Sequence, residues 1–202
     1  MSFVSYVIPQ ILGRFSSTYN SDIRVVEESG KPKLLVNGSR QSGRYIEWLW
    51  RKAFSSFPIG QYTSILVLGV GGGTVIHMLS KLFPDVHITG VDIDAKMIEI
   101  GKKYFGLSQI RNLKLIAADA KSFKTTQYDF VIVDLFIGRH IPDFVSSEFF
   151  LKRLKGKTVV INYLRELEYL EKSKKLEKQL KNVFGEVRDY QIERNRFFFA
   201  RG

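Results

Sequence analysis

The chain has 202 residues, which is enough for one domain with a sizeable hydrophobic core. It is 45% hydrophobic and 25% charged, as is ordinary for a globular protein. It contains no cysteine, which excludes disulfide bonds, thiolate zinc sites and a cysteine nucleophile. The formal net charge of +11 raises the question of a nucleic-acid partner.

The positive charge is dispersed rather than gathered in one block. Between residues 165 and 181 the lysines alternate with glutamates, and three Glu–Lys pairs are spaced four residues apart. This spacing is typical of a solvated helix face. We therefore favour a structural role for the charge, and nucleic acid is a less favoured partner.

The first residues are apolar but lack the basic start of a secretory signal, since the first basic residue is Arg14. No apolar run approaches the roughly 18 residues that cross a bilayer. These features predict a cytoplasmic protein with no membrane partner.

Residues 1–60 predict a small N-terminal β-hairpin region followed by a helix. Two apolar runs, at 23–26 and 34–36, are separated by a Gly-Lys-Pro turn and followed by Asn37-Gly38. Such punctuation is typical of antiparallel strands. A helix is expected at 43–54.

Residues 61–202 predict a Rossmann-like domain. Short aliphatic strands are expected at 65–68, 86–91, 113–117, 130–133 and 158–161. Helices are expected between them at 74–83, 95–105, 146–154 and 166–183, and a hairpin at 187–192 and 196–200. Continuous aliphatic strands alternating with helices indicate a mostly parallel sheet covered on both faces.

The first motif is a glycine loop, Gly69-Val70-Gly71-Gly72-Gly73-Thr74, between the first strand and its helix. Glycines let the backbone turn sharply and let a ligand approach it closely. The third position of a dinucleotide fingerprint is Thr74 here, so the loop indicates a nucleotide-type ligand without naming it.

Carboxylates follow the next strands. Asp92 stands about twenty residues beyond the loop, where an acid can accept hydrogen bonds from ribose hydroxyls. Asp94 is expected to cap the following helix. Asp119 ends the third strand, in position to meet an adenine amino group, and Asp134 ends the fourth, facing the transferred group. Asp134 could orient a nucleophile or take its proton.

These motifs together resemble the spermidine synthase family. The resemblance rests on ILVLGVGGGT at 65–74, VDID at 91–94, ADA at 118–120, YDFVIVD at 128–134, SSEFF at 146–150 and VVIN at 159–162. The turn at 35–42 resembles the family's small β-region, whose glutamine contacts the cofactor; Gln41 matches it. The similarity runs from about residue 9 to residue 184.

Two departures stand out. The family has a second aspartate three residues after the one at Asp134, where this chain has Ile137. It also has an aspartate within the glycine loop, where this chain has Gly72. The sequence is most similar to the divergent, methyltransferase-like branch, which lacks the second acid, and true spermidine synthase activity is not expected.

The resemblance implies a class I S-adenosylmethionine-dependent methyltransferase (Rossmann-like) fold with a mostly parallel seven-stranded sheet. It implies S-adenosylmethionine or decarboxylated S-adenosylmethionine as donor, no metal, and a homodimer. The apolar residues 3–8 are compatible with a dimer interface or with packing on their own domain. The expected cofactor-binding residues are Gln41, Gly69, Gly71, Gly72, Gly73, Asp92, Ile93, Asp119 and Ala120.

Asp134 is the expected catalytic residue, and the acceptor pocket is expected at Tyr45, His140 and Tyr163. The predicted function is a transferase that moves a methyl group, or alternatively an aminopropyl group, to a small acceptor such as an amine. Two further alternatives stay open: an RNA-directed methyltransferase and a non-catalytic nucleotide-binding module.

Overall fold

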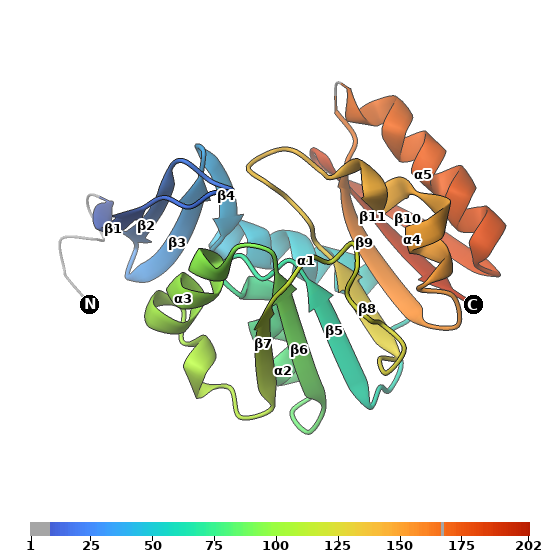
Figure 1. The fold of residues 1–202 in the computed structure, drawn as a ribbon, viewed down its shortest axis with the longest axis horizontal. Coiled ribbons are helices and arrows are strands. Elements are labelled where there is room, and N and C mark those ends of the chain that lie inside the picture. Colours follow the sequence, from blue (N-terminus) through green and yellow to red (C-terminus); the bar gives the residue numbers. More distant parts are fainter. Residues whose placement is uncertain (1–8, 167) are drawn as a thin grey trace.

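The computed structural model describes residues 9–166 and 168–202. The apolar residues 3–8, for which the sequence suggests an interface, lie outside the described residues. Figure 1 shows a small sheet at the N-terminal end of the molecule beside a larger sheet with helices on both faces.

The small sheet is antiparallel and has four strands in the order β1-β2-β3-β4. The predicted hairpin is its central pair, β2 (Ile23–Glu28) and β3 (Lys31–Val36). The outer strands, β1 (Gln10–Phe15) and β4 (Ser39–Ser42), were not predicted, because neither has the apolar alternation of a half-buried strand. The helix α1 (Arg44–Ser56) follows, as expected.

The large sheet has seven strands in the order β10-β11-β9-β8-β5-β6-β7. Its parallel strands are β5 (Ser64–Leu68), β6 (His87–Asp92), β7 (Leu113–Ala117), β8 (Phe130–Val133) and β9 (Thr158–Leu164). The hairpin β10 (Glu186–Ile192) and β11 (Asn195–Arg201) adds to β9 in the antiparallel sense. The predicted fold class, including the mostly parallel seven-stranded sheet, is confirmed.

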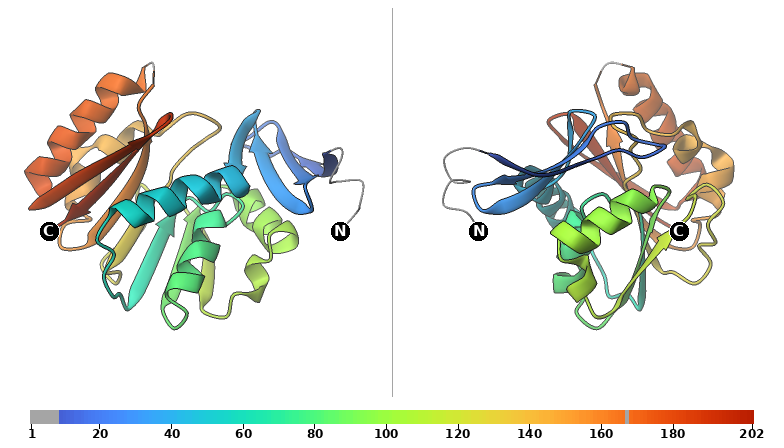
Figure 2. Two further views of the ribbon diagram at one scale, coloured as in Figure 1. Left: turned by 180° about the vertical axis from the view of Figure 1, so that it is seen from behind. Right: turned by 60° about the vertical axis from the view of Figure 1, so that its left-hand side comes forward.

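Alternate residues of the strands face two separate apolar layers. On one face α4 (Glu148–Lys152) and α5 (Tyr169–Val183) cover strand residues such as Leu66 and Val131. On the other, α1 and α2 (Thr74–Leu82) cover residues such as Ile65 and Ile132. Figure 2 shows α1 and α2 on this second face. Burial on both faces accounts for the continuous aliphatic strand sequences.

The small sheet packs on α3 (Ala95–Tyr104). Its residues Ile23 and Leu34 are fully buried against Met97 and neighbouring apolar groups of α3. The carboxylate of Asp94 caps α3 by accepting from the Lys96 N–H, as predicted. It also accepts hydrogen bonds from two residues of the β1–β2 connection, Ser17 and Asn20. This contact fixes the small sheet beside the carboxyl ends of β5 and β6.

Most predicted boundaries lie within two residues of those observed, and the clearest errors fall in three places. The helix expected at 146–154 is a 3₁₀ turn, Asp143–Ser146, followed by α4, because Ser147 has extended backbone and its hydroxyl accepts from the Phe150 N–H. Strand β9 runs three residues beyond the predicted end, paired with β11. Helix α5 correspondingly begins at Tyr169 rather than Glu166. Within the described parts of the chain, no helix is both long and apolar enough to cross a membrane.

Candidate active site

The candidate site lies where the carboxyl ends of β5 and β8 adjoin, at the point where the strand order reverses. Gly69 follows β5 with φ +94°, and a Cβ atom there would lie 2.0 Å from the backbone oxygen of Asp134. The Asp134 N–H in turn donates to the Leu68 carbonyl at 2.8 Å. Only glycine fits position 69. The close approach of Gly69 to the Asp134 backbone places the glycine loop against Asp134. Ligands of open α/β sheets bind at this reversal point.

Asp92 holds the glycine loop in place from the end of β6. One carboxylate oxygen accepts from the N–H groups of Val70 and Gly71, at 2.9 and 3.3 Å, and the other from Asp94 at 2.9 Å. Burial raises the pKa of Asp92, and the three backbone N–H groups act in the opposite direction. Asp92, the residue predicted to bind ribose, therefore also fixes the conformation of the glycine loop.

A narrow crevice of about 50 Å³ opens beside this loop. It brings together six of the predicted site residues: Gln41, Gly69, Gly71, Asp92, Ile93 and Asp134. The Gln41 side chain spans its edge and donates to the Gly138 carbonyl at 2.6 Å. This hydrogen bond joins β4 of the small sheet to the loop that follows β8.

A second cavity, of about 420 Å³, adjoins the crevice and shares Gln41, Asp134 and Phe136 with it. Tyr45 of α1 lies on its wall, as expected, and its hydroxyl donates to Glu193 at 2.5 Å. Burial, followed by the contact with Glu193, raises the pKa of Tyr45 to about 12. Tyr45 is therefore a neutral hydrogen-bond donor at ordinary pH.

Asp134 lies at the junction of the two cavities in a chain of amides. Its carboxylate accepts from the Asn162 side chain at 2.8 Å, and Asn162 accepts from Asn195 at 2.8 Å. Burial raises the pKa of Asp134 to about 6, although the Asn162 amide and the nearby Trp50 indole favour the ionised form. The indole N–H itself lies outside hydrogen-bonding geometry. A carboxyl that titrates near neutrality is suited to proton transfer.

The other predicted cofactor residues lie outside the crevice. Cβ atoms at Gly72 and Gly73 would meet Ser42 and Leu107 at 2.5 and 2.4 Å, so these glycines allow close packing. Asp119 is exposed and its carboxylate accepts from the Lys121 N–H at 2.8 Å, while Ala120 is buried. Their predicted contacts with a cofactor stay predictions.

Two expected acceptor residues lie apart from the second cavity. Tyr163 is 2% exposed and packs edge-on against Tyr169, because alternation along β9 turns Asn162 to the cavity and Tyr163 to the core. His140 is exposed, with its Nδ1 3.4 Å from the Tyr169 hydroxyl. No contact in the described structure supports their acceptor role.

Sequence reasoning missed Asn20, which lines the crevice from the β1–β2 connection. It is 5% exposed; its side-chain amide N–H donates to Asp94, and its side-chain oxygen is buried with no hydrogen-bond partner in the described structure. An unpaired buried oxygen at a crevice is a ready acceptor for a ligand donor. No sequence motif marks Asn20, since its position depends on how the small sheet packs.

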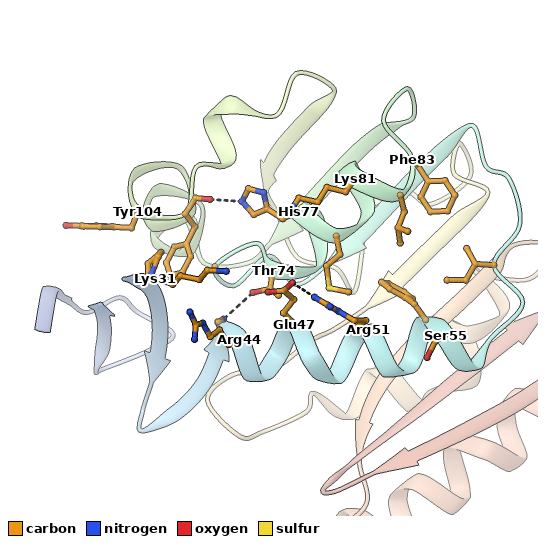
Figure 3. Close-up of a pocket in the computed structure, with 18 of the residues that line it drawn as sticks. Lys31, Arg44, Glu47, Arg51, Ser55, Thr74, His77, Lys81, Phe83 and Tyr104 are labelled. Atoms are coloured by element: carbon orange, nitrogen blue, oxygen red, sulfur yellow. Dashed lines mark hydrogen bonds and ion pairs between the residues drawn. The ribbon is translucent and has the colours of Figure 1, made fainter. Parts of the chain in front are cut away.

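A third and larger cavity, of about 1000 Å³, lies between α1 and α2 (Figure 3). Arg44, Glu47 and Arg51 extend into it from α1, and His77 and Lys81 from α2. Of the predicted site residues only Gly72 lines it, and none of the carboxylates at the strand ends does. Size alone therefore does not make it the candidate active site. Across residues 9–166 and 168–202, no group of three or more acids and histidines is placed to hold a metal ion.

The chain is similar to known proteins in sequence and in fold. The family described as methyltransferase domain matches residues 65–152. A polyamine aminopropyltransferase of Vibrio vulnificus is 33% identical over 97 residues, which are 45% of this chain and 32% of that protein. The mouse eEF1A lysine and N-terminal methyltransferase is 32% identical over 79 residues, 36% of this chain and 11% of that protein. The crystal structure of Thermotoga maritima spermidine synthase superposes with a TM-score of 0.71 at 16% identity, covering 95% of this chain and 72% of that one.

Residues 65–152 thus match a methyltransferase domain, and the curated proteins that the chain resembles are transferases of two kinds, aminopropyltransferases and methyltransferases. The chain is similar to a polyamine aminopropyltransferase in sequence and to a spermidine synthase in fold, which confirms the resemblance predicted from the sequence. The matched part of the chain spans about a third of the Vibrio protein and less of the mouse protein. These matches do not determine which group is transferred or which acceptor receives it.

Proposed function

We propose that the chain binds S-adenosylmethionine or its decarboxylated form in the narrow crevice. It transfers a group, by preference methyl, to a small acceptor in the adjoining cavity. The observation that carries the proposal is the position of Asp134, which lines both cavities at their junction. A group that moves from donor to acceptor would pass beside this carboxylate.

The residues present fit the donor. Gly69 and Gly71 line the crevice and present their backbone to a ligand. The unpaired oxygen of Asn20 supplies an acceptor for a hydroxyl or ammonium group. At about 50 Å³ the crevice is smaller than the roughly 300 Å³ of small-molecule pockets. Donor binding must therefore widen it, and the Gln41–Gly138 hydrogen bond is the contact at its edge that can yield.

The chemistry needs a sulfonium donor, which supplies an electrophilic carbon; the nucleophile's lone pair forms the new bond while the carbon–sulfur pair stays on sulfur. Asp134 accepts the proton that the nucleophile gives up. Asn162 and Asn195 hold the carboxylate in one orientation. Rate would come chiefly from alignment of the two reactants in a site that excludes water.

Two missing acids favour methyl transfer. A carboxylate at position 72 has no room, because a Cβ atom there would lie 2.5 Å from the Ser42 hydroxyl, which accepts from the Gly72 N–H at 2.9 Å. Position 137 is an isoleucine whose backbone pairs with His140. A diamine buried in this site would lack those compensating charges, at a cost of several kcal/mol.

Calorimetric titration tests the proposal. The wild-type chain is titrated in parallel with S-adenosylmethionine and with its decarboxylated analogue, and Asp134→Asn serves as a variant that keeps the crevice. We expect the methionine-bearing donor to bind about tenfold more tightly or better, and Asp134→Asn to bind it within about threefold of wild type. Binding of neither donor would contradict the proposal, and preference for the decarboxylated analogue would assign aminopropyl transfer.

A further inference from the structure

Arginine side chains from three separate segments surround the mouth of the 420 Å³ cavity. Arg40 comes from β4, Arg139 from the loop after β8, and Arg194 from the β10–β11 turn. All three are largely exposed, so their guanidinium groups stand at the entrance rather than in the core. Segments far apart in the sequence thus supply the same chemistry at one opening.

The two carboxylates at this mouth are already engaged. Glu166 is shared by Arg139 and Arg194, at 2.6 and 3.1 Å. Glu193 accepts the Tyr45 hydroxyl. Glu166 is therefore paired with two guanidinium groups, whereas Glu193 is bound by a neutral hydroxyl and keeps its charge.

Arg40 is the unpaired cation at the mouth. It forms no ion pair within the described residues, and its guanidinium lies 5.5 Å from the centre of the Tyr45 ring. Glu28 is close enough for Arg40 to contribute to its lowered pKa, but the main cause is Lys33, whose ammonium pairs with the Glu28 carboxylate at 2.9 Å. Among the described residues, the mouth accordingly holds three guanidinium groups against two carboxylates, and the one further acid on the cavity wall is Asp134 at the junction.

This arrangement is unfavourable for a diamine, which would carry one positive charge to Asp134 and the other to a mouth rich in arginine. It suits a molecule with an anionic group, because guanidinium binds carboxylate and phosphate through paired hydrogen bonds. We infer that the acceptor carries its nucleophile at one end, toward Asp134, and a carboxylate or phosphate group at the other, toward Arg40, Arg139 and Arg194. The inference rests on the proposed function, since it treats this cavity as the acceptor site.

Two matched probes test the inference. 4-Aminobutyrate and 1,4-diaminobutane share a four-carbon chain and an amine, and they differ only in a carboxylate or a second amine at the far end. Each is titrated calorimetrically into the full chain, with and without saturating S-adenosylhomocysteine, and inorganic phosphate is titrated as a third probe. We expect the aminobutyrate or phosphate to bind about tenfold more tightly than the diamine. The tighter of these two anions shows whether the site prefers a carboxylate or a phosphate.

Variants locate the anion. Arg40→Gln should weaken anion binding about fivefold or more, and Arg40→Gln combined with Arg194→Gln should weaken it further. Arg188→Gln is the matched control, because Arg188 is an exposed arginine paired with Glu186 on β10 and does not line the cavity. Tighter binding of the diamine, absence of anion binding, or equal losses in Arg40→Gln and Arg188→Gln would overturn the inference. If S-adenosylhomocysteine binds and the anions do not, the inference about the acceptor is wrong but the proposed function stands. If S-adenosylhomocysteine does not bind, the proposed function itself is wrong.

Discussion

The narrow crevice and the adjoining cavity are built in different ways. The crevice is centred on the glycine loop at the ends of β5, β6 and β8, with Asn20 and Gln41 added from the N-terminal region, and Asp92 fixes the loop through three backbone hydrogen bonds. The cavity is walled by long side chains from β4, α1, two loops and the C-terminal hairpin. Strand pairing thus determines the crevice, whereas contacts between distant loops determine the cavity.

The difference suggests how such a chain can keep its donor and change its acceptor. A substitution at Gly69 or Asp92 disturbs the sheet, because Gly69 packs on the Asp134 backbone and Asp92 holds the glycine loop. A substitution such as one at Arg40 changes only an exposed side chain. Substitutions in the crevice should therefore have larger effects on stability and donor binding than substitutions of exposed side chains at the cavity.

Gly69→Ala should have the largest effect. The new methyl group would lie 2.0 Å from the Asp134 backbone oxygen, at a φ of +94° that disfavours any side chain. We expect a loss of about 3–5 kcal/mol in the free energy of unfolding and at least about a hundredfold in donor affinity. Urea unfolding and calorimetry measure these. Gly156→Ala is the control, since Gly156 has φ +81° but nothing within 4 Å of its Cβ position. Equal losses in both variants would mean that the contact with Asp134 does not matter.

Asp134→Asn should change how stability depends on pH. The unfolded carboxyl titrates near 3.8 and the folded one at about 6, so the folded state holds the proton more tightly. The wild-type free energy of unfolding should therefore fall between about pH 4 and pH 6 and then level, by up to about 3 kcal/mol. The variant should lack this fall and be the more stable protein at about pH 7. Parallel curves from urea unfolding across this range would contradict the assignment. In the wild type, transfer activity should decline below about pH 6, as the base is protonated.

The sequence predicted the crevice better than the cavity, for a physical reason. Parallel pairing of adjacent strands brings consecutive strand ends together, so Gly69, Asp92 and Asp134 could be grouped from their positions after aliphatic runs. Asn162 and Tyr163 show the limit: they are neighbours on β9, but only the first faces the cavity. The register that decides between them is set by pairing with β11, which local sequence does not reveal.

Long-range packing explains the residues that no motif marks. Asn20 reaches the crevice because the small sheet packs on α3, and Arg194 reaches the cavity because a hairpin turn ends beside β9. Neither position has a spacing relation to the glycine loop. The helix split at Ser147 has a more local cause, the hydroxyl cap on Phe150, which the sequence analysis did not recognise.

Asn20→Ala should weaken donor binding about tenfold, because it removes the unpaired oxygen at the crevice. Ser17→Ala is the control: it loses the hydrogen bond to the same Asp94 oxygen, and those that its hydroxyl accepts from the Tyr19 and Asn20 N–H groups, but it keeps the free Asn20 oxygen. We expect the donor affinity of Ser17→Ala to stay within about twofold of wild type in calorimetry. Similar losses in the two variants would assign Asn20 to support of Asp94 rather than to the donor.

Gln41→Ala should have the smallest effect and probes the boundary between the two cavities. It removes the hydrogen bond to the Gly138 carbonyl, which is worth about 1 kcal/mol of stability, and it frees the loop after β8 from β4. If that bond must yield when donor enters, the donor association rate should rise about two- to fivefold while affinity falls by a similar factor, because dissociation quickens more. Stopped-flow and calorimetry measure the two. Gln191→Ala is the control, since Gln191 pairs with Asp189 on the exposed hairpin. An unchanged association rate would mean that the crevice opens at another contact. Gln41 would then belong, like Asp92, to the fixed wall of the crevice.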